Sequence, residues 1–223
     1  MPVPIPVPVP WSKASQAPAT SGTFTAAGWR PKNPIDLPPP TTDAQDAAAR
    51  AENLQALAKL DELPHPPRVR LIRWTTIDTY DATMATCLND AGFTTTEPAP
   101  GGGLSYGTNG IDETQAKAYN TAEYVCAARF SLKPKYATDW TPSQLGLVYD
   151  YDYEALAPCL RERGYAVPPA PSREDFIRDF FSPNTSRWDP YAAISPPEPL
   201  NLQQELYDSC PPRPLSHDLY GYA

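Results

Sequence analysis

Proline is the residue that most limits how this chain can fold. The sequence of 223 residues contains 30 prolines, and eleven of them lie in the first forty positions. Proline has no backbone N–H and a nearly fixed φ, so it interrupts helices and the interiors of sheets. We therefore expect about a quarter to a third of the chain to be extended or irregular, and about 150 residues to form the folded part.

The chain begins MPVPIPVPVPW, with proline at every second position. In an extended strand, neighbouring residues direct their N–H and C=O groups to opposite edges, so the residues between the prolines present one complete hydrogen-bonding edge. Such a segment can add to the sheet of one partner without recruiting a second strand. We predict an extended arm over residues 1–40. Its partner-binding part is Pro2, Val3, Pro4, Ile5, Pro6, Val7, Pro8, Val9, Pro10 and Trp11.

Charge and hydropathy exclude several classes of partner. The net charge is -8, with 18 Lys and Arg against 26 Asp and Glu, whereas a nucleic-acid-binding surface needs an excess of cations. No run of about eighteen apolar residues is present, so we expect no membrane span. The first residues also lack the basic region, apolar core and cleavage site of a signal peptide. We expect either that a signal was removed or that the protein leaves the cell by another route.

Four cysteines, Cys87, Cys126, Cys159 and Cys210, are too far apart for C-x-x-C redox or zinc motifs. The stretches WTTIDTYDATMATCLNDAGFTTTEPAP and WTPSQLGLVYDYDYEALAPCLRERGYAVPPAP share one plan. Each has Trp-Thr, an amphipathic stretch, Cys-Leu-x-x-x-Gly-aromatic and a final Pro-Ala-Pro. An internal duplication is the economical explanation. It predicts a helical domain over residues 68–211, with repeats at about 68–136 and 137–211.

The repeat plan also favours one pattern of disulfides. Gly92 and Gly164 are placed to end a helix in each repeat, and a later helix in each repeat carries the remaining cysteine. Of the three possible connectivities, this plan favours Cys87 with Cys126 and Cys159 with Cys210; four buried free thiols are the alternative. Each bridge would contribute roughly 3–4 kcal/mol in the chain-entropy model. Stable disulfides would place the protein in an oxidising, extracytoplasmic compartment.

Helices are also predicted before the first repeat and within it. Residues 41–67 read as a helix and linker, because Thr42 opens a Thr-x-x-Gln capping box and Leu54, Leu57 and Leu60 fall on one side. In the first repeat, one apolar stripe at helical spacing consists of Ile77, Tyr80, Met84, Leu88 and Ala91. The stretch IDETQAKAYNTAEYVCAARF predicts the helix that contains the second cysteine.

In the second repeat, Thr141 is a predicted N-cap and Pro158 should kink the helix one residue before its cysteine. Ser172 should cap a short helix that buries Phe176 together with Phe180 or Phe181. PRVRLIRW predicts a short strand or extended segment, and residues 212–223 predict an extended C-terminal tail. The fold class is therefore mainly α: two related disulfide-bonded repeats, long proline-rich arms and little sheet.

These motifs resemble a group of actinobacterial secreted or lipid-anchored proteins of unknown function. The resemblance rests on ATCLNDAGF with EYVCAARF, then on the second repeat through PSREDF, WDPYAAI and a late cysteine, over about residues 68–212. It implies an extracytoplasmic, disulfide-bonded helical domain and supplies no catalytic residues. Those proteins have a signal peptide or a lipid-attachment cysteine where this chain has the proline arm.

The sequence gives little support for catalysis. His65 lies in a proline loop and His217 in the predicted tail, so we expect neither to join a Ser or Cys nucleophile. Asp150, Asp152 and Glu154 miss the calcium-loop pattern, and a solvated acidic turn is the favoured interpretation. GGGLSYGTNG lacks a P-loop lysine, so we expect a mobile insertion between two helices. We expect no catalytic residues, no metal site and no cofactor.

The sequence thus predicts a non-catalytic structural or interaction protein, bound to other subunits of an assembly through its N- and C-terminal arms. The more specific hypothesis is a phage virion component, either a capsid decoration or a tail-associated protein, because lysis delivers virions to an oxidising medium without a signal peptide. The alternative is a processed, secreted cell-envelope protein that binds a cell-wall or small-molecule ligand.

Overall fold

A computed structural model describes residues 26–107, 110–183, 185, 187–194 and 200–221, and it is mainly helical. The predicted binding residues 2–11 lie outside this described part. The α-helices are α1 (Asp43–Leu60), α2 (Ile77–Asp90), α3 (Ala116–Arg129), α4 (Pro142–Tyr151), α5 (Ala157–Glu162), α6 (Arg173–Asp179), α7 (Leu200–Ser209) and α8 (Ser216–Tyr220). The shorter elements are the 3₁₀-helices η1 (Ala26–Gly28), η2 (Pro134–Tyr136) and η4 (Pro190–Ala193), the π-helix η3 (Asp152–Leu156), and strands β1 (Glu97–Pro98) and β2 (Leu104–Ser105).

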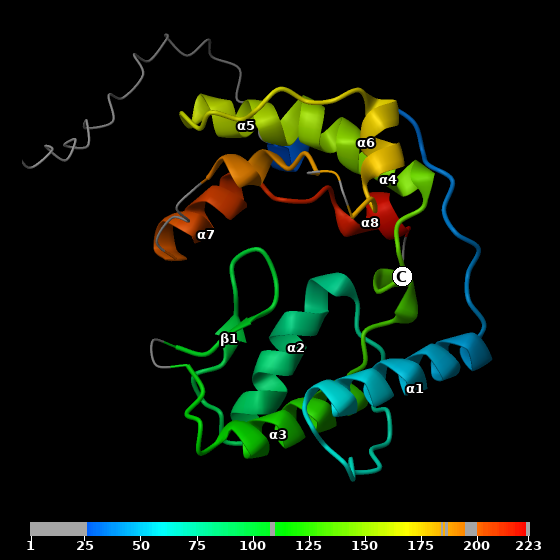
Figure 1. Ribbon diagram of the computed structural model, residues 1–223, viewed down its shortest axis with the longest axis vertical. Helices are drawn as coiled ribbons and strands as arrows, with labels where there is room; N and C mark the ends of the chain where they lie inside the picture. The colour runs from blue at the N-terminus through cyan, green and yellow to red at the C-terminus, as the bar shows by residue number, and fades with distance from the viewer. Residues whose placement is uncertain (1–25, 108–109, 184, 186, 195–199, 222–223) are drawn as a thin grey trace, which may run out of the picture.

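The helices form two groups in space (Figure 1). The N-terminal half, residues 41–136, contains α1, α2 and α3, and the C-terminal half, residues 137–221, contains α4 to α8. Buried apolar residues gather separately in the two halves. One cluster surrounds Met84 and Leu88 between α2 and α3, and another surrounds Leu147 and Leu160 on the long helical segment of the C-terminal half.

Helix α1 begins where the sequence predicts. Thr42 and Gln45 form a reciprocal capping box, which satisfies two backbone N–H groups at the helix start. Leu54 and Leu57 pack against the α2–α3 cluster, as expected. Leu60, predicted on the same side, is instead 79% exposed at the last residue of α1.

A disulfide between Cys87 and Cys126 joins α2 to α3. The two cysteines lie near the C-terminal ends of their helices, with Cα atoms 5.8 Å apart. Of the predicted α2 stripe, Met84 and Leu88 are buried, whereas Ile77 at the first helical position is exposed. Helix α3 starts at Ala116, later than the sequence pattern indicates, because the Asp112 side chain accepts bonds from Thr114 and holds a non-helical turn there.

The Cys159–Cys210 disulfide joins α5 to the end of α7 in the C-terminal half. The long helical segment that leads to Cys159 is irregular, as Pro158 predicts: α4 continues into the π-helix η3 before α5 begins. In a regular α-helix the Pro158 ring would meet the carbonyl of Glu154, and a π-turn relieves this clash. Thr141 and Gln144 form the predicted capping box at the start of α4.

The prediction of an extended arm up to residue 40 is wrong for residues 26–29, which form η1 and the buried Trp29, whereas residues 31–40 contain no helix or strand. Trp29 is buried against the C-terminal half, edge-on to Tyr151 with ring centroids 5.4 Å apart, and its indole N–H donates to Glu154. In Figure 1 the following segment descends along one side of the molecule to α1. Any free arm is therefore confined to residues before Ala26, because an apolar tryptophan anchors the chain at this point.

The C-terminal residues correct a second prediction, since they do not form an extended tail. The chain turns into α8 directly after Pro214 and Leu215, and Gly221 follows the helix with a φ of 72°. Leu219 is 2% exposed, and its carbonyl accepts a bond from the Gln144 side chain at 2.9 Å. These contacts make the C-terminus part of the core, so the described part of it is not an arm that could reach a partner.

Two shorter segments for which the sequence makes a prediction lie between these helices. The PRVRLIRW segment is extended, and its end lies beside the residues after α3, where the Ile72 N–H donates to the Arg129 carbonyl and Thr75 bridges Leu132 in parallel. The glycine-rich stretch lies between α2 and α3, as predicted, but it contributes to the antiparallel β1–β2 hairpin. The Gly103 N–H donates to the Asp81 carboxylate on α2 and ties this hairpin to the helix.

Removing one disulfide tests how much each half depends on it. The double variant Cys159→Ala, Cys210→Ala removes a crosslink between residues that are 51 positions apart in the sequence. The chain-entropy model predicts that the free energy of unfolding falls by about 4 kcal/mol. Urea titration of the oxidised double variant against the wild type measures the loss. A midpoint within error of the wild type would show that packing alone holds α5 and α7 together.

Glu62 gives a second stability prediction. It is the residue after the α1 C-cap and has a φ of 53°, a left-handed conformation that favours glycine. Glu62→Gly should raise the free energy of unfolding by about 0.5–1 kcal/mol, because removing Cβ relieves the strain. Glu62→Ala removes the same carboxylate but keeps Cβ, and it should give no gain. Equal urea midpoints for the two variants would contradict the explanation.

Candidate functional site

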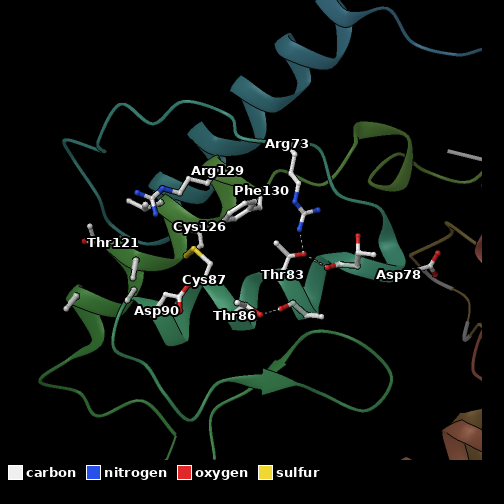
Figure 2. A pocket seen from close by; sticks show the side chains of 16 residues that line it. Arg73, Asp78, Thr83, Thr86, Cys87, Asp90, Thr121, Cys126, Arg129 and Phe130 are labelled. Carbon is white, nitrogen blue, oxygen red and sulfur yellow. Dashed lines mark hydrogen bonds between the residues drawn. A yellow bond between two sulfur atoms is a disulfide. The ribbon is translucent and has the colours of Figure 1, made fainter.

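A surface groove of about 770 Å³ lies between α2 and α3. Figure 2 shows it from close by, with the Cys87–Cys126 disulfide at its centre and Phe130 beside the sulfurs. One wall is the outer face of α2, and the other is the face of α3 that carries Thr121. The groove is therefore built on the two helices that this disulfide joins.

Threonine side chains give the groove an apolar surface. The hydroxyl groups of Thr83, Thr86 and Thr121 each donate to the backbone carbonyl four residues earlier, at 2.7, 2.9 and 2.9 Å. With these hydroxyls satisfied inside the helices, the side chains offer methyl groups to a ligand. Ala82 and Ala118 complete small-residue walls that allow a second backbone to approach closely.

Charged residues surround this apolar surface. The Arg73 guanidinium lies 5.5 Å from the centre of the Phe130 ring and donates to Thr83 at 3.1 Å, so its position over the groove is fixed. Arg129 also lines the groove, as do Asp78 and Asp90 on α2. The Asp78 carboxylate accepts a bond from Ser216 of α8, which connects the groove to the C-terminal half.

Sequence reasoning located the disulfide of this groove but not the groove. The predicted α2 stripe concerned the buried face, with Met84 and Leu88. The opposite face carries Thr79, Ala82, Thr83 and Thr86, at intervals of three and four residues, and this regular stripe of small side chains was a visible signal. The groove face of α3 carries a similar stripe of small residues, Ala118, Thr121, Ala122 and Val125, but one helix face does not show which second helix stands opposite it.

The three acidic residues around η3 do not form the solvated turn that the sequence favours. Asp150 is surface-exposed and paired with Arg173 at 2.9 Å, and Glu154 accepts bonds from Trp29 and Lys32. Asp152 is only 6% exposed, because the π-turn directs it toward the protein interior. The three carboxylates thus lie in separate environments and do not converge on a cation.

Among the described carboxyl groups of the C-terminal half, Asp152 has the pKa that departs most from its ordinary value. Its Oδ1 is buried and has no hydrogen-bond partner among the described residues. Burial raises the pKa of this carboxyl to about 8, with Asp189 acting in the same direction and Arg213 and Arg187 opposing it. At neutral pH the group is therefore mainly protonated, which suits a structural role better than a cation site.

The position of His217 also differs from the expectation. It lies in α8, and its Nε2 is 3.2 Å from the Asp218 carboxylate. The adjacent Ser216 hydroxyl donates to Asp78, so it is directed at α2. Consecutive residues of a helix point about 100° apart, and these three do not take the relay arrangement of a catalytic triad. His65 is exposed in the loop after α1, as predicted.

The described residues contain neither a cluster of metal ligands nor a membrane-spanning helix. No group of three or more His, Cys, Asp or Glu side chains there is arranged to hold a metal ion. Among the helices of that part of the chain, none combines the length and apolar character needed to cross a bilayer.

Comparison with protein-family models, with curated proteins and with solved structures finds no match for this chain. The functional argument therefore rests on the chemistry of its own residues.

The environment of Asp152 predicts an unusual pH dependence of stability. Its pKa is raised in the folded state, so from about pH 4 to pH 8 the unfolded chain loses this proton while the folded protein keeps it. The free energy of unfolding should fall by about 1–3 kcal/mol from pH 5 to pH 8. Asp152→Asn should remove most of this fall, as measured by urea titration at both pH values.

Asp150→Asn is the matched control, since it removes a surface carboxylate two residues away. Its pH profile should follow the wild type. An Asp152→Asn profile that retains the full decline would show that other groups cause it.

Proposed function

We propose that this protein is a non-catalytic structural or interaction protein of an extracytoplasmic assembly. In the more specific form of the proposal it is a phage virion component, a capsid decoration or tail-associated protein, held by its proline-rich N-terminal arm. The two disulfides support an oxidising compartment, since such bonds persist outside the cytoplasm.

The observation that carries the proposal is the α2–α3 groove. Its methyl-lined walls offer shape and apolar area to a partner, and its charged rim offers orientation. An apolar centre with a charged border is the usual anatomy of a protein–protein contact. The disulfide at its centre keeps both walls in place without a partner, so binding requires little ordering of the groove itself.

We further propose that the two halves descend from one duplicated unit. In each half the helix that bears the first cysteine ends at a glycine of positive φ, Gly92 or Gly164. The next residue returns a backbone bond to a fully buried leucine: Phe93 N–H to Leu88, and Tyr165 N–H to Leu160. This shared C-terminal motif, followed by one disulfide per half, supports the repeat and the actinobacterial resemblance that rests on it.

The second candidate function is a processed, secreted envelope protein that binds a cell-wall or small-molecule ligand. The volume of the groove favours it, because about 770 Å³ lies within the range of small-molecule sites. The two proposals differ in where the protein is found and in what occupies the groove.

Filling the groove tests the proposal. Ala118→Trp places a large ring between α2 and α3 at an exposed position, so the body should fold as in the wild type. In the organism that encodes the chain, we expect the wild type to sediment with purified particles and the variant to lose at least tenfold of this association. Quantitative immunoblotting of density-gradient fractions measures the loss.

Ala56→Trp is the control, because Ala56 is an exposed α1 residue that does not line the groove. It should sediment with particles as the wild type does. Recovery of the wild type only from the cell-wall fraction of uninfected cells would contradict the virion proposal and support the envelope protein.

A further inference from the structure

A second cleft, of about 440 Å³, lies in the C-terminal half between α6, the extended residues before it and the loop that leads to η4. None of its lining residues belongs to the α2–α3 groove. Its most distinctive lining is aromatic rings and prolines: Pro168, Pro169, Pro171, Phe176, Phe180 and Trp188.

The aromatic rings of this cleft are held in fixed positions. Phe176 lies 5.5 Å from Phe180 and 6.3 Å from Trp188, measured between ring centroids. The Trp188 indole N–H donates to the Pro168 carbonyl at 3.2 Å, and this bond holds the ring against the proline wall. Fixed aromatic rings in a groove are the chemistry that binds proline-rich extended segments, which lose little entropy on docking.

The chain carries such a segment in residues 2–11, and its attachment point is close at hand. The described chain begins at Ala26, which is buried in the same hydrophobic cluster as Phe176. Residues 12–25, rich in Ser, Ala and Thr, form a spacer between that point and Trp11. Fourteen extended residues span up to about 45 Å, so residues 2–11 can reach a cleft in the same half.

Charge favours the same association through Lys13, which follows the docking segment; residues 2–11 themselves carry no charged side chain. Residues 1–35 contain Lys13, Arg30 and Lys32 and no acidic residue. Residues 137–223 contain thirteen Asp and Glu against six Lys and Arg. Lys32 already pairs with Glu154, and three carboxylates but one guanidinium line the cleft, from Asp175, Asp179, Asp189 and Arg187.

We propose that this cleft binds residues 2–11 of the same chain, so that the arm is docked on its own body until an external partner competes for it. The inference rests on the proposed role of the arm as a binding segment. A short tether keeps the arm at millimolar effective concentration near the cleft, so even a weak intrinsic contact is occupied within one molecule.

Photo-crosslinking of the full, oxidised chain tests the proposal. A benzophenone amino acid replaces Val7, the protein is irradiated at low micromolar concentration, and adducts are mapped by mass spectrometry. We expect most adducts within residues 168–192 and in the monomer band. Adducts spread over the body, or adducts only between two copies, would overturn the proposal.

A variant in the cleft and a control beside it test the cleft side of the contact. Ala192→Arg adds bulk and positive charge at an exposed lining position, and we expect it to lower the crosslink yield at least fivefold. Phe181→Ala is the control, since Phe181 is 55% exposed beside the cleft but does not line it. The same yield in both variants would overturn the assignment of the cleft.

Replacing Pro4, Pro6 and Pro8 together by alanine changes the arm without touching the folded body, so a misfolded protein cannot explain its result. We expect at least a fivefold loss of crosslinking; an unchanged yield would show that proline is not recognised. The gradient experiment with Ala118→Trp reports on the α2–α3 groove alone, so failure of the crosslinks leaves the proposed function standing.

Discussion

The Cys87–Cys126 and Cys159–Cys210 disulfides are the constraint on which the rest of the structure depends. Each half buries only a modest apolar cluster, and small cores of this kind usually need covalent support. Both bonds join the end of one helix to the end of another that lies far along the chain, and in each half irregular, proline-containing segments occupy the sequence between them. The bonds thus allow long loops without loss of the helix packing that shapes the groove and the cleft.

Elements with strong local signals were predictable from the sequence. The capping boxes at Thr42 and Thr141, the Ser172 cap and the interruption before Pro158 all depend on nearby residues, and the structure has each of them. The disulfide pairing was favoured for another reason: the repeated Cys-Leu-x-x-x-Gly pattern pointed to one bond within each half, and the structure has that pairing.

The larger failures involve contacts between distant residues. Asp152 was expected in a solvated acidic turn with Asp150 and Glu154, but in the π-helix before Pro158 it is directed inward and is buried against the rest of the C-terminal half. The C-terminal residues looked like a tail because of their prolines, yet Leu219 is buried by α4, about 75 residues away. The groove was missed because small residues on an exposed helix face become a wall only when a second helix stands opposite.

The two proposed binding surfaces would impose a quantitative relation between the arm and an external partner. If the arm binds its own cleft with an intrinsic dissociation constant of about 0.1 mM, a tether at about 1 mM keeps roughly nine arms in ten docked. An external sheet edge then meets a free arm in about one molecule in ten, and its apparent affinity for the arm falls about tenfold. The α2–α3 groove shares no lining residue with the cleft, so docking of the arm would not lower the affinity of a partner for the groove. A partner that engages the groove first raises its own local concentration near the arm, so docking on the groove would come before release of the arm.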